Sequence, residues 1–255
     1  MRYRYFTELA YNGASFHGWQ IQPNATSVQE TLEKAFSLIT RQNIQITGCG
    51  RTDTGVHARY YVAHFDTEEA LSEPTQLMYQ LNRYLGADIV IYSISAVDSE
   101  THARFHAVER AYEYHIILRK DPFLKDTTLH LPYEPDVESM NKSAKLLLDY
   151  TDFTSFSKLH TDVKTNDCKI LRAEWVNRSS HDLVFHIRAD RFLRNMVRAI
   201  VGTLLEVGKN RMTPEEFENV IVSRNRSKAG TSVPGHALFL TDVVYPKHLF
   251  QRVTD

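Results

Sequence analysis

A glycine-flanked loop between two strand patterns places the strongest limit on how this chain can fold. Residues 44–47 alternate apolar and polar side chains, and residues 60–65 are aromatic and β-branched, so both segments are typical of β-strands. The connection between them contains Gly50 and Gly55 and has no helical periodicity, which favours an antiparallel hairpin. Helix patterns flank this hairpin, so the chain is predicted to be α+β and not a doubly wound parallel sheet.

Periodicity and helix-start signals predict the other elements. A capping box begins at Ser27, Pro74 and Pro214 suit first helical positions, and Asp136 can cap a further helix. Arginines and apolar residues recur at helical spacing over residues 191–204, which predicts a basic amphipathic helix. Further strand patterns cover residues 2–11, 89–97, 109–115, 168–176, 183–189 and 237–240.

The length and composition of the chain allow two halves with a substantial core. The chain has 255 residues, of which 42% are hydrophobic. The order of strands and helices in the second half loosely echoes that in the first. We therefore expect two similar α+β halves with mainly antiparallel sheets flanked by helices, an N-terminal domain over residues 1–105 and a C-terminal domain over residues 106–255.

Neither a membrane span nor a signal peptide is indicated. No stretch approaches roughly 18 consecutive apolar residues, and residues 1–9 alternate as a strand does. We expect a soluble, cytoplasmic protein. Cys49 and Cys168 form neither a disulfide framework nor a metal knuckle, so reduced, buried thiols are expected.

The charges are unevenly distributed along a nearly neutral chain. The net charge is −1, yet residues 61–100 carry seven acidic and one basic side chain, whereas residues 183–255 carry eleven basic and seven acidic ones. Because phosphate contacts depend on local charge, this asymmetry fits a molecule with one cationic face. A solvated surface of mixed charge gives the same pattern.

The loop itself carries a candidate catalytic group. Gly50 and Gly55 give backbone freedom on either side of Asp53, so one carboxylate can be held at a fixed angle while a ligand approaches closely. Arg51 can either keep that carboxylate ionised or bind a phosphate. The ordinary alternative is an Asx-type turn with a surface ion pair.

Other clusters of polar and aromatic residues have simpler interpretations. Aromatic side chains over residues 16–20 either stack on nucleobases or anchor their loop to the core. His102 and His106 lie four residues apart, but no third ligand is suitably spaced, so we expect no metal site. Tyr112 and Tyr114 alternate on a strand pattern and share a face.

Several segments, taken in order, resemble the signature segments of the tRNA pseudouridine synthases of the A type. They are GRTDTGVHA at residues 50–58, the HARFxAxxRxYxY pattern at 102–114, DFTSF at 152–156, FLRNMVRAIVG at 192–202, and the flanking segments near 11–20 and 237–240. The chain departs from the pattern at Ala111, where many relatives have a second arginine. The resemblance spans roughly residues 3–245.

The resemblance implies a role for each of six residues. Asp53 is the catalytic nucleophile, Tyr112 lies in the active site, and Arg198 pairs with the aspartate. Arg51 fills the gap left by an extracted nucleotide or grips its phosphate. Leu238 or Leu240 packs against the base.

The same resemblance implies a reaction and an assembly. The reaction is isomerisation of uridine to pseudouridine in the anticodon stem-loop of tRNA, at positions 38, 39 and 40, without a cofactor or a metal. The fold would be a continuous sheet around a central cleft. The protein would be a homodimer whose substrate is tRNA.

Two other functions fit parts of the sequence. An RNA-binding module without catalysis would use the same basic and aromatic residues, and its affinity for tRNA would fall with salt. A carboxylate hydrolase acting on nucleosides would need a second acid, but no other Asp or Glu is placed by a motif to serve as its partner.

Overall fold

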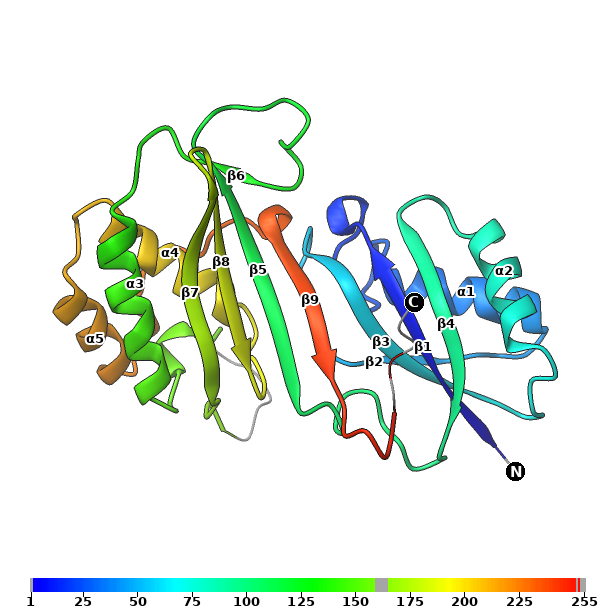
Figure 1. Cartoon of the computed structure of the whole chain (residues 1–255). Coiled ribbons are helices and arrows are strands. Elements are labelled where there is room, and N and C mark those ends of the chain that lie inside the picture. Colours follow the sequence, from blue (N-terminus) through cyan, green and yellow to red (C-terminus); the bar gives the residue numbers. More distant parts are fainter. Residues whose placement is uncertain (1, 159–164, 251, 253–255) are drawn as a thin grey trace. The chain divides into compact units, whose positions relative to one another are not determined.

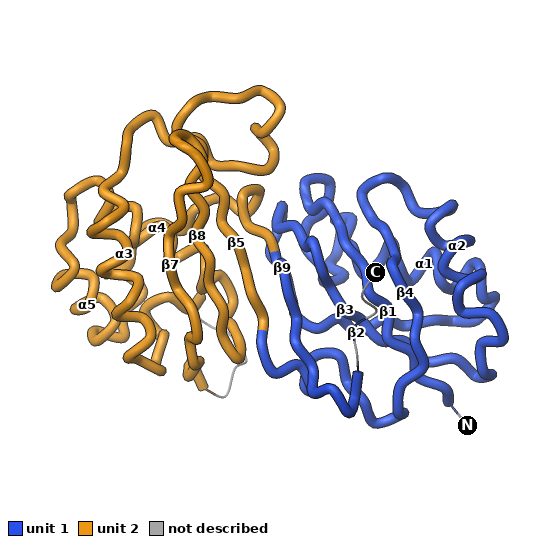
Figure 2. The backbone as a smooth tube through the Cα atoms, viewed as in Figure 1, with its two compact units in different colours: residues 1–109, 240–255 blue, residues 110–239 orange. Residues whose placement is uncertain are grey.

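The computed structural model describes residues 2–158, 165–250 and 252. The chain divides into two compact units, one made of residues 1–109 and 240–255 and the other of residues 110–239 (Figure 2). Strands and helices are interspersed along the chain and most described strand pairs are antiparallel, which confirms the predicted α+β class.

The first unit has a sheet whose strands run in the order β4-β1-β3, with β2 paired to β3 (Figure 1). Helix α1 packs against β2 and α2, and α2 packs against β4. The elements are β1 (Tyr3–Tyr11), α1 (Val28–Thr40), β2 (Ile46–Gly48), β3 (His57–Thr67), α2 (Pro74–Tyr84) and β4 (Ile89–Val97).

Helix α1 begins and packs as its sequence pattern predicts. The Ser27 side chain accepts a hydrogen bond from the Glu30 N–H at 3.2 Å, which satisfies one of the free donors of the first turn. The apolar stripe that includes Leu32 and Phe36 is fully buried, and the Phe36 ring meets Phe65 of β3 edge-on. The helix is therefore fixed to its sheet by one continuous apolar face.

The second unit repeats part of this arrangement. Strands β5, β8 and β7 are neighbours in that order, and β6 pairs with β5. If the two-residue β6 is set aside, the first strand of each unit pairs with the third, and the third with the second. Helix α3 packs against α4, α5 and β7. The elements are β5 (Glu109–Ile117), β6 (Leu129–His130), α3 (Val137–Leu146), β7 (Ile170–Ser179), β8 (Asp182–Ala189), α4 (Met196–Gly208) and α5 (Pro214–Val222).

The last strand, β9 (Leu238–Val244), carries the chain back to the first unit. The Val108 N–H donates to the carbonyl of Val244 at 2.8 Å, and the Tyr245 hydroxyl donates to the carbonyl of Ala103 at 2.6 Å. The rings of Tyr245 and Phe250 both contact Phe6 of β1. The expected domains assign residues 240–255 to the second half, whereas these contacts group them with the first compact unit.

Helix α4 begins later than its sequence pattern predicts. The expected helix over residues 191–204 begins only at Met196, because Asn195 has a left-handed backbone with φ of 66°. Arg191, Phe192 and Arg194 therefore lie in the loop before the helix and not on its surface. The prediction of one continuous basic helix was wrong over these residues.

The two cysteines match their expected state. Cys49 and Cys168 are buried thiols outside any disulfide. Burial raises the pKa of the Cys168 thiol to about 12, so this thiol stays protonated at neutral pH. Separately, no helix in the described part of the chain is long and apolar enough to cross a membrane.

Candidate active site

The Asp53 loop joins β2 to β3, which pair antiparallel as predicted. Gly55 has φ of 77°, a left-handed conformation that favours glycine, and the Val56 N–H donates to the carbonyl of Asp53 at 3.1 Å. The Asp53 side chain is half-buried. The loop therefore turns sharply just after the carboxylate and leaves it partly accessible.

A neighbouring segment, residues 13–19, clamps the backbone of this loop. A β-carbon on Gly18 would lie 2.4 Å from the carbonyl oxygen of Thr52, and one on Gly13 would lie 2.1 Å from that of Val56. The Trp19 N–H donates to the Thr52 carbonyl at 3.2 Å. Sequence reasoning missed this clamp, although Gly13 and Gly18 were its visible signal, since close backbone approach requires glycine.

The aromatic side chains within residues 16–20 anchor this neighbouring segment to the core. Phe16 and Trp19 are buried, and the Trp19 ring stacks on Tyr61 of β3 with centroids 4.2 Å apart. The Tyr61 hydroxyl donates to the carbonyl of Gly50, at the start of the Asp53 loop. Of the two interpretations offered for these aromatics, anchoring is the one that the burial of Phe16 and Trp19 supports.

The expected role of Gly50 was wrong. A β-carbon at this position would have no heavy atom within 4 Å, and Gly50 has no positive φ, so neither space nor conformation requires a glycine there. The next residue, Arg51, is exposed. Only Gly55 of the two flanking glycines supplies conformational freedom to the loop.

In the second unit, Tyr112 lies on β5 opposite Ile187 of β8. Its half-buried ring meets Phe192 edge-on, with centroids 5.2 Å apart and an interplanar angle of 88°. Because Phe192 belongs to the loop before α4, this contact joins β5, which carries Tyr112, to the segment that carries Arg198. The sequence gives these two motifs no visible link.

Tyr114, two residues further along β5, is fully buried, so its side chain does not reach the solvent. Its hydroxyl donates to the carbonyl of Pro234 at 3.0 Å. Burial raises the pKa of Tyr114 well above its usual value, against a smaller opposing effect of the Arg198 charge. Tyr114 is therefore a neutral structural group beside Arg198.

Arg198 lies in the first turn of α4 and is half-buried. Its Nε donates to the carbonyl of Val233 at 2.7 Å, and the Val233 N–H donates back to the carbonyl of Arg198 at 3.2 Å. A cation at a helix N-terminus is disfavoured by the helix dipole, and the first turn of α4 contains no acidic residue. A carboxylate or phosphate near this guanidinium would relieve that unfavourable charge.

The two leucine candidates are both buried in β9. Leu238 is 5% exposed and Leu240 is 2% exposed, and their spacing places them on the same face of the strand.

Within the second unit, Tyr112 and Arg198 are linked through Phe192 and the start of α4. Asp53 and Arg51 belong to the first unit.

No group of three or more His, Cys, Asp or Glu side chains suited to a metal ion occurs among residues 2–158, 165–250 and 252. His102 and His106 instead support their own loop, because the His102 N–H donates to Nδ1 of His106 at 3.1 Å. They have a local structural function in the turn.

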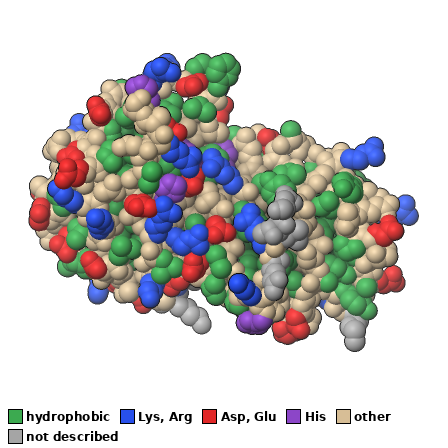
Figure 3. All heavy atoms as spheres, viewed as in Figure 1, with side chains coloured by type: hydrophobic (Ala, Val, Ile, Leu, Met, Phe, Trp, Pro, Cys, Tyr) green, Lys and Arg blue, Asp and Glu red, His purple; other side chains and the backbone are tan. Residues whose placement is uncertain are grey.

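Basic side chains on the visible face of the second unit are mixed with acidic and histidine side chains (Figure 3). Arg172 pairs with Glu174, and Arg178 pairs with Glu113 at 3.2 Å. Paired charges of this kind weaken any single-sign field. The cationic face expected from the sequence stays a prediction.

Comparison with known proteins gives extensive similarity. A family model described as tRNA pseudouridine synthase matches residues 9–106 and 144–246. A protein named tRNA pseudouridine synthase A from Parabacteroides distasonis is 56% identical over 248 residues, which cover 97% of this chain and 98% of that protein. Proteins of the same name from Bacteroides thetaiotaomicron and Bacillus pumilus are 53% and 38% identical over 253 and 242 residues, covering 98% and 93% of this chain and 94% and 97% of those proteins. The family model includes Asp53 and Arg198, while Tyr112 lies between its two matched segments.

Proposed function

The chain belongs to the tRNA pseudouridine synthase family, and we propose that it isomerises uridine in the anticodon stem-loop of tRNA, at positions 38, 39 and 40, with Asp53 as nucleophile. Membership of this family makes the protein an isomerase that acts on RNA. The observation that carries the proposal for Asp53 is the clamp on its loop: Gly18 and Trp19 contact the backbone directly before a half-buried carboxylate. A nucleophile needs such preorganisation, because small displacements are costly in rate.

The reaction conserves all atoms of the nucleoside. The glycosidic bond from N1 to the sugar C1′ breaks, the uracil turns, and a bond forms from C5 to C1′; the C5 proton leaves and N1 ends protonated. The Asp53 carboxylate attacks either C1′ or the uracil ring, and in both cases it is released when the C5 product forms. No electron is gained or lost, so the proposed reaction needs neither a redox partner nor another cofactor.

We assign Arg198 as the cation that pairs with the Asp53 carboxylate. Its place in the first turn of α4 supports this assignment, because an anion near a helix N-terminus is stabilised by the helix dipole as well as by the guanidinium. Besides the Nε that donates to the Val233 carbonyl, the guanidinium carries Nη groups, whose N–H bonds suit a carboxylate.

Tyr112 is proposed to lie against the uracil and to act as acid or base when a proton moves. Its half-buried ring, held edge-on by Phe192, suits a group that must keep one face available to a base. A uridine within the anticodon stem-loop must be turned out of its stack to reach such a site.

The remaining candidates are proposed to hold the everted nucleotide. Arg51 is exposed, as a side chain that fills the vacated stack or grips a phosphate has to be. Leu238 or Leu240 is proposed to pack against the base from within the core, since both side chains are buried. Because tRNA is its proposed substrate, we expect the enzyme to act in the cytoplasm.

Release of tritium from tRNA labelled at C5 of uridine tests the proposed reaction. We expect the purified chain to release tritium, and primer-extension mapping of pseudouridine to place the product at positions 38, 39 and 40. Tight, salt-sensitive binding of tRNA without tritium release would identify an RNA-binding module instead. Product only outside the anticodon stem-loop would overturn the assigned position.

A further inference from the structure

A strap of residues 229–233 lies directly along the backbone of α4. The Gly230 N–H donates to Oγ1 of Thr203 at 2.9 Å. A β-carbon on Gly202 would lie 1.9 Å from the carbonyl oxygen of Thr231, so the strap and the helix approach as closely as backbones can. The position of the strap is thus tied to that of the helix.

The end of this strap holds Arg198. Val233 is buried, and it both accepts from the Arg198 Nε at 2.7 Å and donates its N–H to the Arg198 carbonyl at 3.2 Å. The Nε hydrogen bond fixes the plane of the guanidinium, because all five of its N–H groups lie in one rigid fork. Moving Val233 would therefore rotate the charged group.

Arg226 also holds the strap. Its Nη1 donates to the carbonyls of Ala229 and Gly230 at 3.3 and 3.2 Å, and its Nη2 donates to the Ser232 Oγ at 2.9 Å. The same Ser232 Oγ accepts from the Asn195 side chain at 2.7 Å, at the start of α4. One planar side chain thus contacts three residues of the strap.

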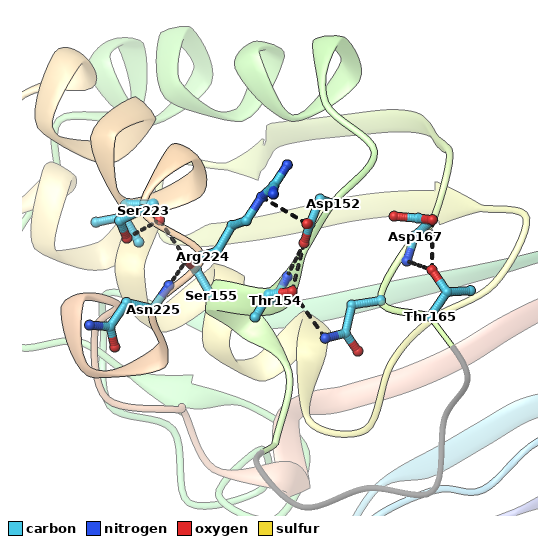
Figure 4. Close-up of polar contacts among 10 residues, drawn as sticks. Asp152, Thr154, Ser155, Thr165, Asp167, Ser223, Arg224 and Asn225 are labelled. Carbon is cyan, nitrogen blue, oxygen red and sulfur yellow. Dashed lines mark hydrogen bonds and ion pairs between the residues drawn. The ribbon is translucent and has the colours of Figure 1, made fainter.

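The turn that carries Arg226 is itself anchored to the segment 152–155 (Figure 4). Arg224 pairs with Asp152 at 2.9 Å, and the Asn225 N–H donates to the Ser155 Oγ at 2.9 Å. That hydroxyl in turn donates to the carbonyl of Val220 at 2.6 Å. The two residues before Arg226 are therefore held by separate contacts to one segment.

We propose that Arg226 is a positioning residue, which sets the orientation of the Arg198 guanidinium through Ser232 and Val233. The inference rests on the proposed function, in which Arg198 pairs with the Asp53 carboxylate. Arginine is required because a lysine ammonium cannot reach the carbonyls and the Ser232 hydroxyl with one planar donor set.

Steady-state kinetics on tRNA test the role of Arg226. We expect Arg226→Ala to lower kcat about 10- to 100-fold with little change in KM, since misplacement of a catalytic group by about 1 Å has effects of that size. Arg226→Lys should recover only part of the loss. Lys228→Ala is the matched control, because Lys228 is an exposed cation on the same turn and its removal takes away the same charge.

A double-mutant cycle separates positioning from other roles. In an Arg198→Lys background, Arg226→Ala should lower kcat by less than about twofold, because its partner is already altered. Additive losses, or an equal rise in KM for Arg226→Ala and Lys228→Ala, would overturn the proposal. If Arg226→Ala does not fold, Ser232→Ala removes the shared acceptor and takes its place, with the same expected loss in kcat.

The result for Asp53→Asn distinguishes the two levels of inference. Activity retained in Asp53→Asn contradicts the proposed catalytic function itself. Activity lost in Asp53→Asn but unchanged in both Arg226→Ala and Ser232→Ala contradicts only the positioning role.

Discussion

The carboxylate of Glu113 on β5 lies among three nitrogen-bearing side chains. His115 Nε2 is 3.0 Å from it, Arg178 Nη2 is 3.2 Å away and His186 Nδ1 is 3.4 Å away. The hydrogen bond from His115 is the largest influence, and with the nearby positive charges it outweighs burial and lowers the pKa of Glu113 to about 2. One side chain thus links β5, β7 and β8.

This pKa predicts how stability changes with pH. The unfolded chain binds the Glu113 proton near the ordinary value of 4.5 and the folded chain only near 2. Between these values the unfolded state binds more protons, so the stability that Glu113 contributes is present above about pH 5 and is lost as the pH falls toward 2. The difference corresponds to roughly 3 kcal/mol. Urea unfolding at several pH values should show Glu113→Gln to be less stable than wild type at pH 7.

The same titration, repeated with a second variant, provides the control. The free energy of unfolding of Glu113→Gln should fall less steeply below pH 5 than that of wild type. Glu174→Gln removes a half-exposed carboxylate on the neighbouring β7 and should leave the steepness unchanged. Parallel curves for wild type and Glu113→Gln would contradict the assignment.

At the scale of elements, Gly18 and Gly50 look alike in the sequence but differ in the space around them at the Asp53 loop. Gly18 has φ of 89° and its β-carbon would lie 2.4 Å from the Thr52 carbonyl, whereas Gly50 has open space. Gly18→Ala should therefore displace the backbone before Asp53. We expect a loss of stability of about 1 to 3 kcal/mol and a fall in kcat of at least tenfold.

Gly50→Ala is the matched variant in the same site. Because its β-carbon meets nothing and its φ is not positive, we expect unchanged kcat and a stability equal to or slightly above that of wild type. Thermal unfolding and tritium release measure both variants. Equal effects of Gly18→Ala and Gly50→Ala would show that the clamp does not hold the loop.

Local sequence patterns predicted most elements, because periodicity and caps are short-range signals. Strand β4 has the predicted bounds, and Pro74 and Asp136 stand at the predicted helix starts. The start of α4 was predicted too early, since the apolar spacing continues into residues 192–195 while the left-handed Asn195 interrupts the helix. Periodicity alone cannot detect one residue of reversed backbone conformation.

The candidate site was predictable only in part. The motif segments that contain Asp53, Tyr112 and Arg198 stand out in the sequence through their resemblance to a family. The supports around them do not, because they join residues far apart in the chain: Gly18 with Thr52, and Ser232 with Asn195 at the start of α4. Such contacts depend on tertiary packing and have no periodic signal.

At the scale of the whole molecule, the segment after β9 packs against β1. The Phe250 ring is 8% exposed and lies 5.1 Å from the ring of Phe6 and 5.8 Å from that of Tyr245. Phe250→Ala should therefore destabilise the protein by about 3 kcal/mol in chemical unfolding. Phe123→Ala removes a ring that is 92% exposed and should change stability by less than about 0.5 kcal/mol.

We also propose that the molecule works as a homodimer. Sedimentation equilibrium at the protein concentration of the activity assay should give twice the mass of the 29.5 kDa chain. A monomer with full activity at that concentration would contradict the proposal. A dimer that dissociates together with the loss of activity would support it.

The central claim is that the Asp53 carboxylate is the nucleophile of uridine isomerisation, and tritium release by Asp53→Asn tests it most directly. Asparagine keeps the size of the side chain but removes its charge and nucleophilicity, so the clamped loop should stay folded while kcat falls on the order of 10³-fold or more. Circular dichroism and tRNA binding like those of wild type would show that only chemistry is lost. Tritium release by Asp53→Asn at a rate close to that of wild type would contradict the account.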